Sequence, residues 1–207
     1  MTQSKADFLD FLVQQGALRF GEFTLKSGGR SPFFVDLGQI CTGDSLWRLG
    51  EFLADAVVNN YGAVDVLYGP PYKAIPMIAA AAIALRQRTG KDVGVCYSRK
   101  EAKEHGERGT LVGMLPGPEA RILVVDDVFT TGATKLEALE TLEEAGGVRA
   151  TGILVSVDRR TQGQDAGIGD IPLTALVHLG DIVDYMEQVG DSRAHLVRGF
   201  WENQYGP

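Results

Sequence analysis

The sequence predicts an α/β protein in which a central, mostly parallel β-sheet is covered by helices on both faces. Short runs that are almost continuously apolar alternate with longer runs at helical spacing. Such apolar runs are typical of parallel strands buried on both faces, and the helices between them supply the crossovers. Residues 1–43 break this alternation, so we expect them to form a small N-terminal cap (hood) over the sheet. Residues 44–207 would form the core, with the C-terminal tail beside the cap.

The N-terminal elements follow from local patterns. An amphipathic helix is expected before Gly16, and the aromatic- and Thr-rich residues 17–38 predict short strands around the turn "SGGRSP". Apolar residues at helical spacing predict a helix from Asp44 to Gly62. "VDVLYG" then predicts a strand, and "AIPMIAAAAIAL" a helix that tolerates Pro76 only in its first turn.

The second half of the chain continues the alternation. "VGVCYS", "RILVVDD", "TGILVSVDR" and "LTALVHL" predict strands, and "RKEAKEHGERGTLVG" predicts a long exposed loop. The helix after "RILVVDD" would bury Leu136, Leu139 and Leu142, and a short tail helix would begin at about Asp181.

Composition limits the possible partners and the compartment. The 27 acidic and 20 basic residues give a net charge of -7, which disfavours general binding to nucleic acid or anionic membranes. Cys41 and Cys96 lie in no metal-binding spacing and fit a reducing compartment. The start has no signal-peptide pattern and no apolar run approaches about 18 residues. We therefore expect a cytoplasmic protein, with any anion site built from a local cluster of basic residues.

The segment "ILVVDDVFTTGAT" places two carboxylates beside a hydroxyl-rich turn that opens a helix. Free N–H groups at a helix start bind phosphate, Thr131 and Thr134 can add hydroxyl donors, and Gly132 allows close approach. Asp126 and Asp127 beside a phosphate require hydrogen-bond donors, such as the 2' and 3' hydroxyls of a ribose. The segment lacks the "GK[ST]" and "GxGxxG" patterns of other nucleotide sites. The plainer interpretation is a solvated strand end followed by an ordinary helix start.

The whole string resembles the motif that binds 5-phosphoribosyl 1-pyrophosphate (PRPP) in the type I phosphoribosyltransferases. With it, "LRFGEFTLKSGGRSPFF", "GPPYKAIP" and "SRKEAKEHGERGTLVG" occur in the order and spacing of the orotate-specific branch of that family, over most of residues 17–160. The resemblance implies transfer of a 5-phosphoribosyl group from PRPP to orotate in pyrimidine biosynthesis. It also implies Mg²⁺ carried by PRPP rather than by protein ligands, and a homodimer whose catalytic loop acts in the partner's site.

The resemblance also implies a role for individual residues. Positive charge at the departing pyrophosphate would come from Arg99, Lys100, Lys103, His105 and Lys73. Substrate contacts would come from Lys26, Phe34, Val35, Tyr72, Asp126, Asp127, Val128, Phe129, Thr130, Thr131, Gly132, Ala133, Thr134 and Arg159. Basic side chains in the loop fit the chemistry, because negative charge builds on the leaving pyrophosphate in an oxocarbenium-like transition state.

Two points of the base pocket stay open. Arg159 matches the arginine that binds the orotate carboxylate, with Thr130 as its companion, but Arg160 is an alternative. Phe34 would cover the ring, although Val35 stands where the family commonly has a second aromatic residue. The pyrophosphate turn is "PPYKA" where "PAYKG" is usual.

Three rival functions remain. A purine phosphoribosyltransferase would share the PRPP motif, and Arg159 and the lysine-rich loop argue against it. A PRPP-sensing regulator that binds RNA would need a basic face, for which a charge of -7 leaves little room. A catalytically dead binding module would have lost the loop lysines or the aspartates, and both are present.

Overall fold

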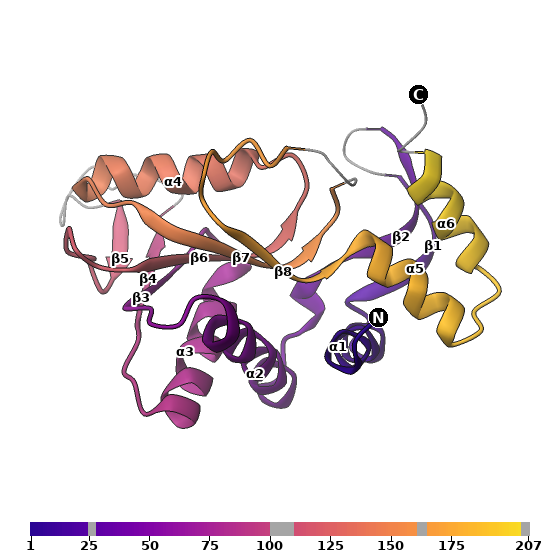
Figure 1. Ribbon diagram of the computed structural model, residues 1–207, viewed down its shortest axis with the longest axis horizontal. Helices are drawn as coiled ribbons and strands as arrows, with labels where there is room; N and C mark the ends of the chain where they lie inside the picture. Colours follow the sequence, from indigo (N-terminus) through magenta and orange to yellow (C-terminus); the bar gives the residue numbers. More distant parts are fainter. Residues whose placement is uncertain (25–27, 100–109, 161–164, 204–207) are drawn as a thin grey trace.

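The computed structural model describes residues 1–24, 28–99, 110–160 and 165–203 of the chain (Figure 1). In these ranges a six-stranded sheet has the order β5-β4-β3-β6-β7-β8, and every neighbouring pair is parallel except β4 with β5. The strands are β3 (Val66–Gly69), β4 (Gly94–Ser98), β5 (Leu111–Gly113), β6 (Ile122–Phe129), β7 (Ala150–Asp158) and β8 (Leu173–His178). The prediction of a mostly parallel sheet is confirmed.

Helices cover both faces of this sheet. Helix α4 (Ala133–Gly146) lies on one face, and α2 (Gly43–Asn60) and α3 (Ala74–Thr89) lie on the other (Figure 1). The buried apolar residues accordingly form two clusters, one on each side of the strands. Pro76 lies in the first turn of α3, where its missing N–H breaks no helical hydrogen bond. Among the described residues, no helix is long and apolar enough to cross a membrane.

The two ends of the chain meet beside the sheet. Helix α1 (Gln3–Gln14) and the antiparallel pair β1 (Leu18–Thr24) and β2 (Arg30–Val35) lie close to α5 (Leu179–Gln188) and α6 (Ala194–Asn203) (Figure 1). The Tyr185 hydroxyl donates to Asp10 at 2.6 Å, and Lys5 pairs with Asp181 at 2.7 Å. A division of the chain at residue 43 stays a prediction, but these contacts hold α1 against α5.

Three details differ from the sequence prediction. Strand β5 forms inside the stretch expected to be a loop, because its backbone pairs with the edge of β4. The tail contains a second helix, α6, whose apolar residues pack on β2. In α4 the fully buried positions are Lys135, Ala138 and Leu142, whereas Leu136 is 39% exposed. The buried face of α4 is therefore rotated from the predicted one.

Candidate active site

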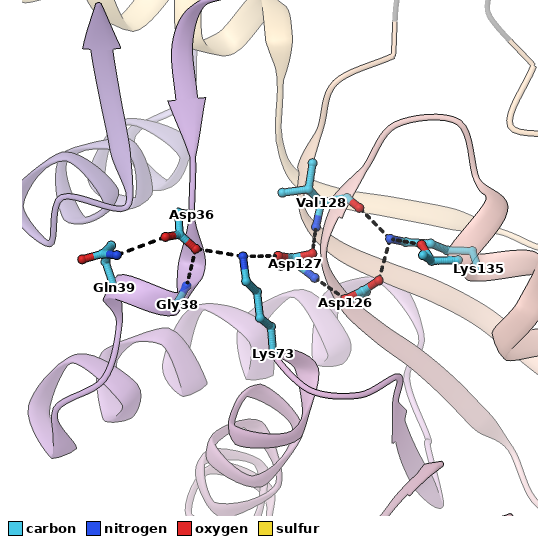
Figure 2. A network of polar contacts seen from close by, with 9 residues as sticks. Asp36, Gly38, Gln39, Lys73, Asp126, Asp127, Val128 and Lys135 are labelled. Atoms are coloured by element: carbon cyan, nitrogen blue, oxygen red, sulfur yellow. Dashed lines mark hydrogen bonds and ion pairs between the residues drawn. The ribbon is translucent and has the colours of Figure 1, made fainter. Parts of the chain in front are cut away.

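The carboxyl ends of β3, β6 and β7 bring charged side chains together at one edge of the sheet. Lys73 follows β3, Asp126 and Asp127 lie near the end of β6, and Arg159 directly follows β7. Asp36, at the end of β2, faces Lys73 (Figure 2). In parallel sheets this edge is where ligands bind.

The two aspartates have different environments. Asp126 is 7% exposed, and its Oδ2 lies 2.5 Å from the ammonium of Lys135. Its Oδ1 accepts from the backbone N–H of Asp127 at 2.8 Å. Asp127 is less enclosed: its Oδ1 accepts from the Val128 N–H at 2.7 Å, and its Oδ2 faces Lys73 (Figure 2). Strand β6 thus continues past the acidic pair to Phe129 rather than ending on it.

The pKa of Asp127 reflects the crowding of negative charge. Burial raises the pKa of this carboxyl, and the charge of Asp126 raises it further. The Val128 N–H and the charges of Lys73 and Lys135 act in the opposite direction without cancelling the rise. An isolated pair of buried carboxylates would be costly, so the two lysines are what allow both groups to lie here.

Lys73 bridges the core and the segment after β2. Its Nζ lies 2.8 Å from Oδ1 of Asp36 and 3.6 Å from Oδ2 of Asp127 (Figure 2). The hydrogen bond to Asp36 raises the pKa of Lys73 and lowers that of Asp36. About half of the lysine side chain is exposed, so its charge can reach a ligand. The preceding turn contains a cis peptide between Pro71 and Tyr72, and Tyr72 is largely exposed.

The turn after β6 requires a glycine at position 132. Gly132 has φ +82°, and a β-carbon there would lie 2.7 Å from the carbonyl oxygen of Ala166. Its own carbonyl accepts the N–H groups of Lys135 and Leu136. The N–H groups of Ala133 and Thr134 precede these bonds and have no intrahelical partner. These free N–H groups lie at the positive end of the α4 helix dipole, where they can donate hydrogen bonds to a phosphate.

Arg159 and Arg160 are held in different ways. Arg160 is paired with Asp158, with Nη2 to Oδ2 at 2.8 Å, and its guanidinium lies 4.9 Å from the Phe129 ring. His178 also approaches Asp158, at 3.6 Å. Burial alone would raise the pKa of Asp158, but hydrogen bonds from His178 and Arg160 outweigh it and leave the pKa well below its usual value.

Arg159, by contrast, has no carboxylate within ion-pair distance in the described parts of the chain. Its guanidinium lies 4.8 Å from the centroid of the Phe33 ring, and its Nη2 is 3.4 Å from the hydroxyl of Ser31. Burial lowers its pKa from the usual arginine value. A partly buried guanidinium without an acidic partner is suited to a carboxylate ligand.

The aromatic residues of β2 point to opposite sides, as alternation in a strand requires. Phe33 and Val35 are buried, and Phe33 is the ring that contacts Arg159. Phe34 lies on the other side, stacked on Phe23 at 5.5 Å with Arg19 over its face. A role for Phe34 at the base stays a prediction, and Phe33 is a neighbour of Arg159 that the sequence analysis missed.

The remaining predicted residues fall into three groups. Lys26, Lys100, Lys103 and His105 lie outside the described residues. Arg99 follows β4, and its backbone N–H donates to Thr110. Val128, Thr130, Thr131, Ala133 and Thr134 lie along the end of β6 and the start of α4, whereas the Phe129 side chain is buried in the core, so only its backbone can face a ligand. Asp36 and Lys135 were not predicted.

Comparison with known proteins identifies the class of this fold and site. The family described as "Phosphoribosyl transferase domain" matches residues 38–171, which include the turn after β3, the acidic pair and Arg159. The chain is 41% identical to the orotate phosphoribosyltransferase of Methylococcus capsulatus, over 100% of this chain and 99% of that relative. It is 40% identical to the enzyme of the same name from Pseudomonas aeruginosa, over 95% and 94% of the two chains.

A solved structure agrees with these relatives. The crystal structure of the Francisella tularensis orotate phosphoribosyltransferase superimposes with a TM-score of 0.79 and 28% identity, covering 96% of this chain and 98% of that one. The chain belongs to the orotate phosphoribosyltransferase family. The predicted resemblance is thereby confirmed, and the class of enzyme is a pentosyltransferase.

Proposed function

We propose that this chain transfers the 5-phosphoribosyl group of PRPP to orotate, which gives orotidine 5'-monophosphate and pyrophosphate in the synthesis of UMP. One juxtaposition carries the proposal. The paired aspartates of β6 lie directly before the proposed phosphate-binding start of α4. Arg159, which has no acidic partner among the residues that the structure describes, follows the neighbouring strand β7.

The donor site is built from β6 and α4. Asp126 and Asp127 accept hydrogen bonds from the two ribose hydroxyls, and the N–H groups of Ala133 and Thr134, with the Thr131 and Thr134 hydroxyls, hold the 5'-phosphate. Gly132 permits the close approach, because any side chain there would strike Ala166.

The acceptor site is centred on Arg159, with Thr130 as the companion hydroxyl. The planar guanidinium of Arg159 matches a carboxylate in a bidentate pose. Arg160 is the weaker candidate, because Asp158 already holds its guanidinium. Phe34 and Val35 would border the flat ring, and Lys26 and Tyr72 would contact the substrates at their edge.

The leaving pyrophosphate is stabilised by positive charge. Lys73 lies within reach at the end of β3, and Arg99, Lys100, Lys103 and His105 would add charge from the loop after β4. Mg²⁺ would enter as the complex of PRPP and offset part of the pyrophosphate charge. The acidic pair fits ribose better than a metal, since each aspartate already faces a lysine. In the described residues, no group of three potential ligands could hold a metal ion.

A homodimer in which the loop of one subunit serves the partner's site is part of the proposal. Mixing a Lys103→Ala protein with an Asp126→Asn/Asp127→Asn protein tests it, since subunit exchange would create one intact site. Recovered activity is expected, and no recovery despite demonstrated exchange rejects shared sites. The cytoplasm is the proposed compartment, supported by the free thiols of Cys41 and Cys96.

The decisive assay follows the loss of orotate absorbance after addition of PRPP and Mg²⁺. Adenine, hypoxanthine and uracil serve as alternative acceptors. Consumption of orotate alone is expected, whereas equal use of a purine would support the purine-type alternative. Binding of PRPP without consumption of any base would point to the regulator.

A further inference from the structure

We propose that Lys135 is a positioning residue for the donor site, which holds the Asp126 carboxylate in place beneath the ribose. This inference rests on the proposed function, because it concerns how the acidic pair is prepared for PRPP.

The three N–H groups of the Lys135 ammonium have three acceptors. Its Nζ lies 2.5 Å from Oδ2 of Asp126, 2.5 Å from the carbonyl oxygen of Val128 and 3.2 Å from the hydroxyl of Thr134 (Figure 2). The side chain is only 3% exposed. A lysine with this geometry has little freedom, and it links the strand that carries the acids to the helix that would bind the phosphate.

The location of Lys135 is unfavourable for a lysine in two respects. It lies in the first turn of α4, where the positive end of the helix dipole repels a cation. It also occupies a core-facing position in line with Ala138 and Leu142, where an apolar side chain would normally pack. Burial of a charge is costly unless it is paired, so the pairing with Asp126 is the compensating interaction.

Lys135 would also stay paired with the acidic pair after the substrate binds. The groups facing the acidic pair are Lys135 from α4 and Lys73 from the start of α3, with Asp36 after β2 behind Lys73. Lys73 is half-exposed and, in the proposed reaction, turns to the pyrophosphate. The charge of Lys135 lowers the pKa of Asp127, so its removal would raise that pKa further, and a protonated carboxyl is a poorer acceptor for a ribose hydroxyl.

The test compares Lys135→Met with Lys135→Arg and with Lys91→Met, which removes the same charge from an exposed position at the other edge of the sheet. PRPP affinity is measured by titration calorimetry without orotate, and KM and kcat by orotate consumption, across pH 5 to 9. For Lys135→Met we expect PRPP affinity to fall about tenfold at pH 8. The acid limb of its PRPP profile should move up by about 1–3 pH units. At saturating PRPP the high-pH kcat should be retained, Lys135→Arg should recover most of the affinity, and Lys91→Met should behave as the wild type.

A double variant keeps the inference testable if Lys135→Met does not fold. Asp126→Asn/Lys135→Met removes both buried charges, so neither group is left unpaired. Because Lys135 acts through Asp126, the double variant should bind PRPP as Asp126→Asn alone does. A further loss in the double variant, or a folded Lys135→Met with wild-type affinity and acid limb, overturns the inference. If the wild type itself fails to bind PRPP or to consume orotate, the proposed function is what fails.

Discussion

Lys73 and Asp36 form an ion pair that joins the start of α3 to the end of β2, with 2.8 Å between Nζ and Oδ1. Asp127 lies 3.6 Å from the same ammonium, so Lys73 is shared between two carboxylates. A pyrophosphate at this edge would offer a stronger anion than either. Asp36 thus holds Lys73 near the proposed pyrophosphate position, and this ion pair can break when the pyrophosphate binds.

Substitution of each member of this pair separates substrate contact from structural pairing. Lys73→Ala should lower kcat about 10²–10³-fold, because a charge aimed at the leaving group is lost. Asp36→Asn should keep most of the activity and lose at most about 1 kcal/mol of stability, since the pair is partly exposed. Steady-state kinetics and urea unfolding measure both effects. Equal kinetic losses in the two variants would contradict direct contact of Lys73 with the substrate.

Arg159 should control affinity for the acceptor. Arg159→Ala is expected to raise the KM for orotate about 100-fold, with a much smaller change in the KM for PRPP, because only the carboxylate loses its hydrogen bonds. Arg159→Lys should be nearly as poor, since an ammonium cannot reproduce the bidentate fork.

Arg160→Ala is the matched control for that experiment. It should cost about 2 kcal/mol of stability, because it leaves Asp158 buried at 2% exposure without its main partner. Its KM for orotate should change less than that of Arg159→Ala. The reverse order of the two KM values would assign the carboxylate to Arg160 instead.

Gly132→Ala should damage the phosphate-binding turn. A side chain at φ +82° costs roughly 1–2 kcal/mol, and its β-carbon would meet Ala166 at 2.7 Å. The turn must shift, and kcat/KM for PRPP should fall on the order of 100-fold. Gly147→Ala is a control with a similar φ of +65° and open space around it, and it should lose stability without a change in KM.

Asp127→Asn should make the protein more stable and less active. The pKa of Asp127 is raised in the folded state, so its favourable contribution is complete below the unfolded pKa of about 3.9 and is lost as pH rises through the folded pKa. At pH 7.5 the ionised group therefore costs stability that asparagine would not. Thermal melts should show a higher Tm for the variant at pH 7.5 and little difference near pH 3.5, while the KM for PRPP rises about 10–100-fold.

The parallel sheet was predictable because the sequences of its strands are almost continuously apolar and alternate with helical segments. The short edge strand β5 was not, since three residues, Leu111–Gly113, carry no periodicity and pair only because β4 offers a free edge. Likewise α6 could not be predicted from its own sequence, because a short amphipathic helix depends on tertiary contacts, here with β2, for its stability.

The arrangement of the candidate site was predictable where its residues are close together in the sequence. The acidic pair and the turn at Gly132 form one contiguous string, and local chemistry explains them. Asp36 was missed because its partner, Lys73, is remote in the chain. Lys135 was missed because the predicted buried face of α4 was made of Leu136, Leu139 and Leu142. The spacing of residues 135, 138 and 142 would have revealed a lysine on the core side.

The Phe33 ring lies between Arg159, at 4.8 Å, and Phe200 of α6, at 5.8 Å. This cluster therefore joins β2, the residue after β7 and helix α6. During synthesis on a ribosome, β6 and the turn proposed to bind the donor emerge well before α6 does. A nascent chain can thus form the proposed PRPP site early, whereas the wall behind Arg159 is complete only after α6 has been translated and has docked.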